Sequence, residues 1–199
     1  MAAYEVNGLV STSLATHAGV GAATALTFSL RLQELVLGVF VVSVGTVLLP
    51  DLSALAATSQ WKPYRERLIR ALEVIALITV PVAVFSISER IDIVAVLFKT
   101  MEFDDASVAL TASVFFFHMI GLPFIGANRI LAPAFYARSD TRTPAWAGIA
   151  AVIINITAVF ALQPLMGAPG IALALSLASA VNTGILVAML ARVGIDGLG

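Results

Sequence analysis

A stripe of polar and small residues runs through an apolar stretch near the start of the chain, and these are the residues best suited to chemistry. Its members follow one another at spacings of three, four or seven residues, which places them on one side of a helix. They are Thr24, Thr27, Arg31, Glu34, Gly38 and Gly45. The pattern indicates a helix that presents a guanidinium and a carboxylate from inside an apolar segment.

Two interpretations of Arg31 and Glu34 follow from the cost of a charge that faces lipid, about 2.5–3.5 kcal/mol per residue. This cost predicts that both side chains face the protein interior or a water-filled cavity. In the first interpretation they neutralise one another across one helical turn and hold helices together. In the second, Arg31 contacts an anionic solute, and Glu34 orients it or takes part in coupling. Gly38 and Gly45 are expected to allow a close helix approach on the same side, and Gln33 to bond to a neighbouring helix.

Other polar residues within apolar segments are weaker candidates for cavity lining or coupling. They are Asn7, Ser11, His118, Asn155, Ser179 and Thr183. For His118 we expect a hydrogen-bonded packing role, with a proton relay as the alternative. For the others, hydrogen bonds between helices explain the polar side chain about as well as cavity lining does.

The composition argues against an enzyme and against a nucleic-acid-binding protein. The sequence has no cysteine, two histidines and a net charge of −1. It offers no nucleophile–base pairing at useful spacing, no metal-ligand cluster and no phosphate-binding glycine loop. A net charge close to zero does not suggest attraction to nucleic acid. We therefore predict no catalytic residue, no metal and no cofactor.

The elements that position the stripe are predicted to be membrane-spanning helices. Of the 199 residues, 60% are apolar and 12% are charged. Because each crossing needs roughly 20 mainly apolar residues with internally bonded backbone, long continuous apolar segments must be helices. The sequence predicts an all-α bundle of six spans, at roughly 3–17, 22–49, 69–88, 106–131, 144–165 and 169–191.

Proline and charge indicate where these spans end and how they are oriented. Pro50 is expected to close the second span and Pro144 to open the fifth. Eight of the eleven Lys and Arg residues fall in loops that six alternating spans place on one face, which the positive-inside rule makes cytoplasmic. Segment 52–68 is predicted to lie along that surface, with Trp61 and Tyr64 at headgroup depth.

Two stretches, "RLQELVLGVFVVSVGTVLLPDLS" and "LAPAFYARSDTRTP", resemble the signature regions of the MviN/MurJ family of lipid II flippases. That family belongs to the multidrug/oligosaccharidyl-lipid/polysaccharide exporter superfamily, whose members have two six-helix lobes around a central cavity. The resemblance implies that this chain is a fragment covering spans seven to twelve, hence the second lobe. The first lobe and the family's last two helices would then be missing, and the single lobe would not transport alone.

The resemblance also implies a function and a site. Lipid II, an undecaprenyl-pyrophosphate-linked disaccharide-pentapeptide, would be moved to the outer leaflet of the bacterial inner membrane by alternating access. The family has a cavity-lining arginine in its eighth span that is needed for function, and Arg31 occupies the matching position. Glu34, Thr27 and Thr24 would lie beside it. The implied partners are lipid II, membrane lipid and the missing first lobe.

Some family members bind sodium through an acidic residue in the seventh span. The other sodium ligands in those members are polar residues of the eleventh and twelfth spans. Here Ser11 stands at the position of the acidic residue, and Asn155 and Thr183 would be remnants of the other ligands. Because a sodium site without a carboxylate is poorly supported, membrane potential is the better-supported energy source. Two alternatives to lipid II flipping stay open. One is a polysaccharide-lipid flippase, such as one for O-antigen, or a cation-coupled drug exporter of the same superfamily. The other is a structural membrane module that does not transport.

Overall fold

The computed structural model describes residues 21–192, apart from the side chains of residues 40–44 and 46. Every regular element in this range is helical, as predicted from the sequence. The elements are α2 (Ala22–Val36), the π-helical turn η1 (Leu37–Val41), α3 (Val42–Ala57), α4 (Trp61–Ser88), α5 (Arg90–Phe98), α6 (Asp105–Ala137), α7 (Arg142–Met166) and α8 (Ala168–Arg192).

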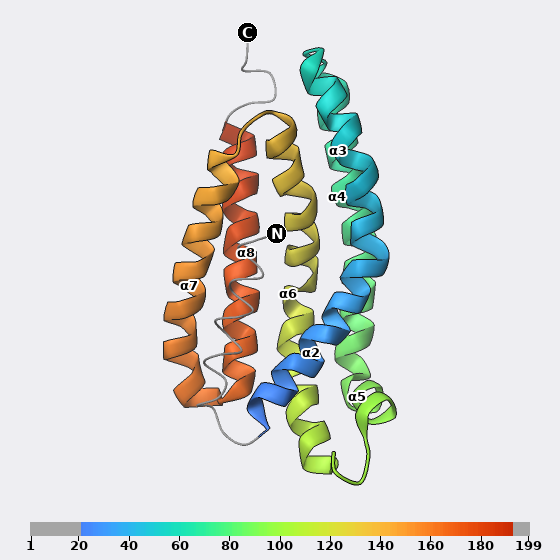
Figure 1. Ribbon diagram of the computed structural model, residues 1–199, viewed down its shortest axis with the longest axis vertical. Helices are drawn as coiled ribbons and strands as arrows, with labels where there is room; N and C mark the ends of the chain where they lie inside the picture. The colour runs from blue at the N-terminus through green and yellow to red at the C-terminus, as the bar shows by residue number, and fades with distance from the viewer. Residues whose placement is uncertain (1–20, 193–199) are drawn as a thin grey trace.

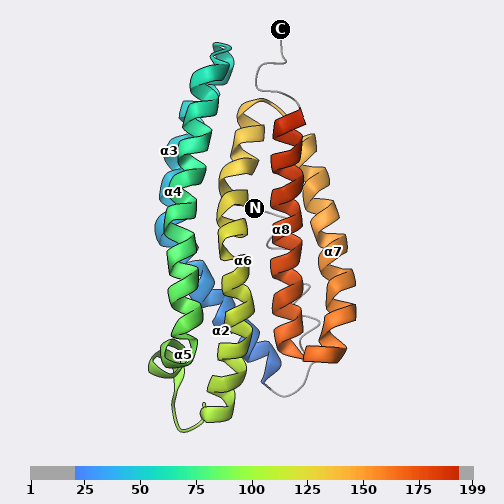
Figure 2. The ribbon, with the colours of Figure 1, turned by 180° about the vertical axis from the view of Figure 1, so that it is seen from behind.

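Helix α6 lies at the centre of the bundle (Figures 1 and 2). Helix α8 packs on one side of it and α7 packs in turn on α8, while α3 and α4 run together along the other side. Helix α2 crosses α6 obliquely near the end at which α6 begins. This arrangement gives α2 one face against the bundle and leaves its opposite face without a covering helix in the described part of the chain.

Four of the described helices, α4, α6, α7 and α8, are long and apolar enough to cross a membrane. The protein is therefore a multi-pass membrane protein. Helices α2 and α3, joined by η1, form a further continuous run of helix from Ala22 to Ala57. The predicted first span, 3–17, lies outside the described residues.

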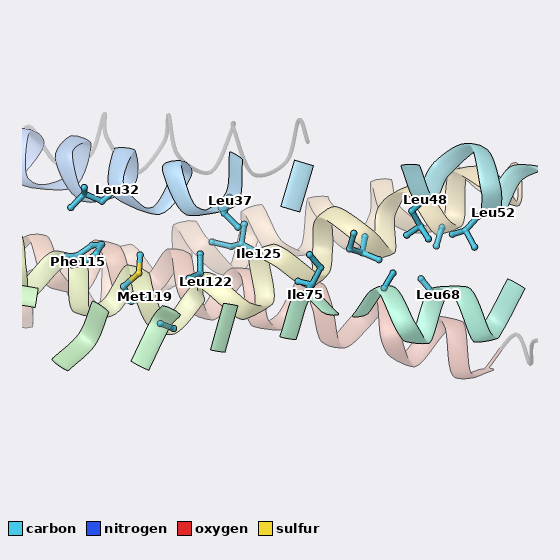
Figure 3. Close-up of a cluster of buried hydrophobic side chains, with 14 of the residues drawn as sticks. Leu32, Leu37, Leu48, Leu52, Leu68, Ile75, Phe115, Met119, Leu122 and Ile125 are labelled. Carbon is cyan, nitrogen blue, oxygen red and sulfur yellow. The ribbon is translucent and has the colours of Figure 1, made fainter. Parts of the chain in front are cut away.

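The largest buried cluster fills the space between α6, α4 and the α2–α3 run. Figure 3 shows side chains from all three converging: Leu32 and Leu37 come from the α2–α3 run, Phe115 and Leu122 from α6, and Ile75 from α4. Dispersion contacts between such closely packed apolar groups hold the helices together even where lipid offers an equally apolar surrounding.

The helices near the basic end are longer than the predicted spans. Helix α3 continues through Pro50 to Ala57, so the expectation that Pro50 closes the second span is wrong. The predicted surface segment 52–68 is instead the last turns of α3, a short turn and the first two turns of α4. Tyr64 is fully buried, and its hydroxyl donates to the carbonyl of Ala134 at 2.6 Å, so its ring faces α6, and its headgroup depth stays a prediction.

Helices α7 and α8 form a tight hairpin, as the sequence indicates. A single residue, Gly167, separates them, and its φ of 66° is a conformation that favours glycine. A Cβ atom on Gly170 would lie 2.5 Å from the carbonyl oxygen of Leu162, so only glycine permits this approach. Pro144 lies in the first turn of α7, where its missing N–H removes no helical hydrogen bond.

Candidate functional site

Helix α2 has one buried face and one exposed face. The buried face packs against α6 and α8 and consists of Ala22, Ala25, Leu26, Ser29, Leu32 and Gln33. On the other side, Thr24, Arg31, Glu34 and Gly38 are exposed, and Thr27 is half-buried. The structure therefore brings the first five stripe residues to one face, as predicted, and turns that face away from the interior of this bundle.

A buried polar contact fixes α2 on α6. The Ser29 hydroxyl and His118 Nδ1 share a hydrogen bond of 2.6 Å, and Gln33 Nε2 donates to the backbone carbonyl of His118. This confirms the expectation that Gln33 bonds to a neighbouring helix. His118 is buried and hydrogen-bonded, which fits a packing role, although its Nε2 has no hydrogen-bond partner among residues 21–192.

The charged face lies deep within the span. Helix α6 has 33 residues, which corresponds to a length of about 50 Å. His118 lies about 20 Å from its start on the same scale, and the Ser29–His118 bond places α2 at this level. Arg31 and Glu34 follow within about one turn, so both charges lie near the level of the middle of α6.

Arg31 and Glu34 are not paired with each other. Within residues 21–192, ion pairs join Arg67 to Asp51 and Lys99 to Asp105, while neither Arg31 nor Glu34 takes part in one. The interpretation in which the two stripe charges neutralise one another across a helical turn is therefore wrong for this structure. No carboxylate in residues 21–192 occupies the Arg31 guanidinium in an ion pair.

The predicted stripe is interrupted after Gly38. The π-helical turn η1 widens the hydrogen-bonding pattern between Leu37 and Val41, and it rotates everything that follows relative to α2. Gly38 is exposed, with no heavy atom within 4 Å of where its Cβ would lie. Gly45 is half-buried, and a Cβ added there would lie 3.8 Å from the Arg129 carbonyl oxygen, an ordinary van der Waals contact. The expectation that Gly38 and Gly45 permit a close approach on one side is wrong.

The weaker candidates lie mainly between helices. The hydroxyl of Thr183 donates to the carbonyls of Phe124 and Ser179, and the Ser179 hydroxyl donates to Leu175 within α8. Asn155 is buried in α7. The Thr183–Phe124 bond joins α8 to α6, and cavity lining stays a prediction for each of these residues. Asn7 and Ser11 lie outside the described residues.

A metal centre has no visible ligand set in the described part of the chain. No group of three or more His, Asp or Glu side chains lies close enough together to hold an ion there. The arrangement on α2 instead suits non-covalent contact with an anion, because the exposed Arg31 guanidinium offers several donors in one plane.

Sequence reasoning missed Ser29, the residue that bonds to His118 from the other helix. A lone serine in an apolar span carries little information by itself. The usable signal is its spacing of four residues from Gln33, which defines a second, inward polar pair on α2.

The fold and this face together define a multi-pass helical membrane protein that presents Arg31 and Glu34 on an exposed helix face, with no ion pair to either within residues 21–192. A family model described as "Lipid II flippase MurJ" matches residues 1–196. The chain belongs to this family.

Individual relatives agree with the family model. The chain is 39% identical over 183 residues to a probable lipid II flippase MurJ of Treponema pallidum, covering 92% of this chain and 35% of that protein. It is 30% identical over 187 residues to the lipid II flippase MurJ of Burkholderia cenocepacia, covering 94% and 36%. The chain thus spans about a third of the length of these curated relatives.

A solved structure of a relative has the same fold. It is a lipid II flippase MurJ in an inward closed conformation, which superimposes with a TM-score of 0.86 at 24% sequence identity. The match covers 95% of this chain and 40% of that one. The helical arrangement described above is therefore the arrangement of part of that flippase.

Proposed function

We propose that this chain forms the second lobe of a lipid II flippase of the bacterial inner membrane, a transporter rather than an enzyme. Membership of the family supports this proposal over a polysaccharide-lipid flippase or a drug exporter. The observation that carries it is the exposed guanidinium of Arg31, which stands at mid-depth and has no ion-pair partner within residues 21–192. Such a group requires water or an anion, because facing lipid would cost about 2.5–3.5 kcal/mol.

The chemistry of Arg31 fits the substrate of the family. Lipid II carries a pyrophosphate, and a planar guanidinium can donate two parallel hydrogen bonds to phosphate oxygens. Thr24 is exposed on the same face and can donate a hydrogen bond to the headgroup. The hydroxyl of Thr27 already donates to the carbonyl of Ala23 at 2.8 Å, so it offers mainly an acceptor. Glu34 would repel phosphate, which suits a role in orienting Arg31 or in release.

Transport would proceed by alternating access without making or breaking a covalent bond. Helix α2 is fixed to α6 by the Ser29–His118 and Gln33–His118 contacts, so the charged face would move with the whole bundle as one body. The protein would alternate between an inward-open and an outward-open state. The population of each state would depend on how tightly it binds the substrate and on the membrane potential, which acts on charges that move across the membrane between the two states.

The opposite wall of the cavity would be a first lobe, for which the uncovered face of α2 leaves room. The cytoplasmic side would be the end at which α3, α6 and α8 finish and α4 and α7 begin (Figure 1). That end carries Lys62, Arg65, Arg67, Arg70, Arg138, Arg142 and Arg192, which fits the positive-inside rule.

Accessibility labelling tests whether the charged face meets water. The chain has no cysteine, so single substitutions report without background. We expect Glu34→Cys and Thr24→Cys to react with a membrane-impermeant maleimide. Leu77→Cys is the matched control, because Leu77 is 74% exposed on the apolar face of α4 and is expected to face lipid. Equal lack of reaction at Glu34→Cys and Leu77→Cys would sink the cavity proposal.

Transport itself is tested in the full-length protein that contains this lobe. Arg31→Ala should reduce headgroup translocation in proteoliposomes at least about tenfold, since a contact to a charged group contributes roughly 1.5–3 kcal/mol. Translocation at the unsubstituted rate would refute the role of Arg31. Labelling of Glu34→Cys without any lipid II translocation would instead retain the cavity and reject the substrate.

A further inference from the structure

A cleft of about 420 Å³ opens at the basic end of the bundle, well away from the charged face of α2. It lies between the last turns of α3, the first turn of α4 and the last turn of α6. Its lining residues are Ser53, Ala56, Ala57, Trp61, Tyr136, Ala137, Arg138 and Ser139. One side is thus apolar and small, and the other carries two aromatic rings and one cation.

The cation of this cleft lies against an aromatic ring and forms no ion pair within residues 21–192. The Arg138 guanidinium lies over the Trp61 ring, 5.6 Å from its centroid, and it enters no ion pair in the described range. The nearest carboxylate along the chain, Asp140, interacts with the charge of Arg138. Its oxygens accept hydrogen bonds from the backbone N–H of Arg142 and from the backbone N–H and the hydroxyl of Thr143. A cation–π contact leaves the edge of a guanidinium free to donate to an anion.

Carboxylates on the α3 side are engaged as well. Asp51 is paired with Arg67 at 3.0 Å, which joins α3 to α4 beside the cleft. Arg138 is the charged residue among those that line the cleft, and further arginines lie at the same end of the bundle.

The position of the cleft selects the kind of ligand. It lies at the ends of α4 and α6, two helices that are long and apolar enough to cross a membrane, so it opens at the boundary of lipid and water. Trp61 is half-buried there and Tyr136 is 45% exposed, and such rings are typical of headgroup depth. The alanine side would accept the glycerol and upper acyl region of a lipid, which a soluble anion does not have.

We propose that this cleft binds the phosphate of an anionic phospholipid, with the Arg138 guanidinium as the phosphate contact and Trp61 as the residue that positions it. Nothing in this proposal depends on lipid II or on transport. Bound lipid would tie α3, α4 and α6 together at one end of the bundle.

Native mass spectrometry of the purified protein with dioleoyl phosphatidylglycerol measures the binding directly. We expect Arg138→Gln to weaken the apparent Kd about tenfold or more, as for loss of a contact to a charged group. Arg142→Gln is the matched control, because Arg142 carries the same charge four residues further along the chain, is exposed and lies outside the cleft. This substitution should change the Kd by less than about twofold. Arg138→Lys should retain part of the binding.

A second variant keeps every charge and fills the space. Ala57→Trp, at an exposed position that ends α3, should abolish the same lipid binding without changing the melting temperature. Equal weakening by Arg138→Gln and Arg142→Gln would reduce the site to general basic attraction and overturn the proposal. Binding of dioleoyl phosphatidylcholine as tight as that of phosphatidylglycerol, or full competition by soluble glycerol phosphate, would overturn it too.

Discussion

The side chains of Ser29 and His118 meet 2.6 Å apart inside the seam between α2 and α6, and this contact sets which face of α2 turns outward. Successive residues of a helix are rotated by about 100°. Arg31, two residues after Ser29, therefore points to nearly the opposite side when Ser29 is directed at His118. The orientation of α2 about its own axis therefore determines both the buried polar contact with α6 and the exposure of its charged residues.

Loss of the Ser29 hydroxyl should destabilise the bundle. Ser29→Ala leaves His118 Nδ1 buried without its partner, and an unsatisfied buried group costs about 1–3 kcal/mol. We expect a lower apparent melting temperature in detergent. Ser113→Ala is the control, because the Ser113 hydroxyl is exposed and bonds only within its own helix, to the carbonyl of Ala109. Equal stability of the two variants would mean that the seam contact contributes nothing.

The contact between α6 and α8 depends on a glycine at position 121. A Cβ there would lie 2.5 Å from Ser176 Oγ and 3.1 Å from Ser176 Cα, and the Ser176 hydroxyl donates to the Phe117 carbonyl at 2.6 Å. Gly121→Ala should therefore force the helices apart and cost about 1–3 kcal/mol, measured by unfolding in mixed detergent.

Gly184→Ala is the matched control for that measurement. Position 184 is also in a helix, but no heavy atom lies within 4 Å of its added Cβ. We expect this change to be neutral or to stabilise the protein by up to about 1 kcal/mol, since alanine favours helix over glycine. A Gly121→Ala protein as stable as the Gly184→Ala protein would contradict the close approach.

Much of this arrangement could be predicted from the sequence, because lipid leaves the chain few choices. The all-α fold follows from apolar length, and the side-by-side placement of Thr24, Arg31 and Glu34 follows from helical spacing. Gln33 was predicted to bond elsewhere because it falls off that stripe. In each case a local pattern determined the outcome.

The errors concern residues whose environment is set by distant parts of the chain. Helix α3 continues through Pro50, although proline lacks the N–H of a helical hydrogen bond. Tyr64 is buried, and the Ala134 carbonyl, 70 positions along the chain, accepts its hydroxyl hydrogen bond. The π-helical turn at Leu37–Val41 has no sequence pattern of its own, so the divergence of Gly38 and Gly45 could not be foreseen. The Trp61–Arg138 cleft joins residues 77 positions apart.

The loop between α6 and α7 should make stability depend on acid pH through Asp140. Burial raises the pKa of Asp140, but hydrogen bonds from Thr143 and Arg142 and the charge of Arg138 outweigh it, and the pKa lies below its ordinary value. A lowered folded-state pKa stabilises the protein above the unfolded pKa of about 3.9, and this contribution is lost as the pH falls through the folded-state value.

Melting temperatures measured from about pH 3 to about pH 7 check this dependence, because this range extends to both sides of the ordinary Asp pKa of about 3.9. Asp140→Asn should melt below the unsubstituted protein at neutral pH, and the difference should shrink as the pH falls below about 4. Asp51→Asn is a useful comparison, since Asp51 bonds to Arg67 in an ion pair and lies outside this loop. A difference for Asp140→Asn that stays constant across the range would contradict the lowered pKa.

Replacement of Arg31 by lysine separates charge from geometry. Lysine keeps the positive charge but loses the planar fork that matches two phosphate oxygens. We expect Arg31→Lys in the full-length protein to reduce headgroup translocation about tenfold, as for loss of one hydrogen bond to a charged group. The melting temperature should not change, because Arg31 is exposed and joins no ion pair in residues 21–192. Arg70→Lys, at an exposed arginine near the basic end, should leave both quantities unchanged. A drop in stability that parallels the drop in translocation would assign Arg31 a packing role, because a side chain that contacts only a transient substrate cannot support the resting fold.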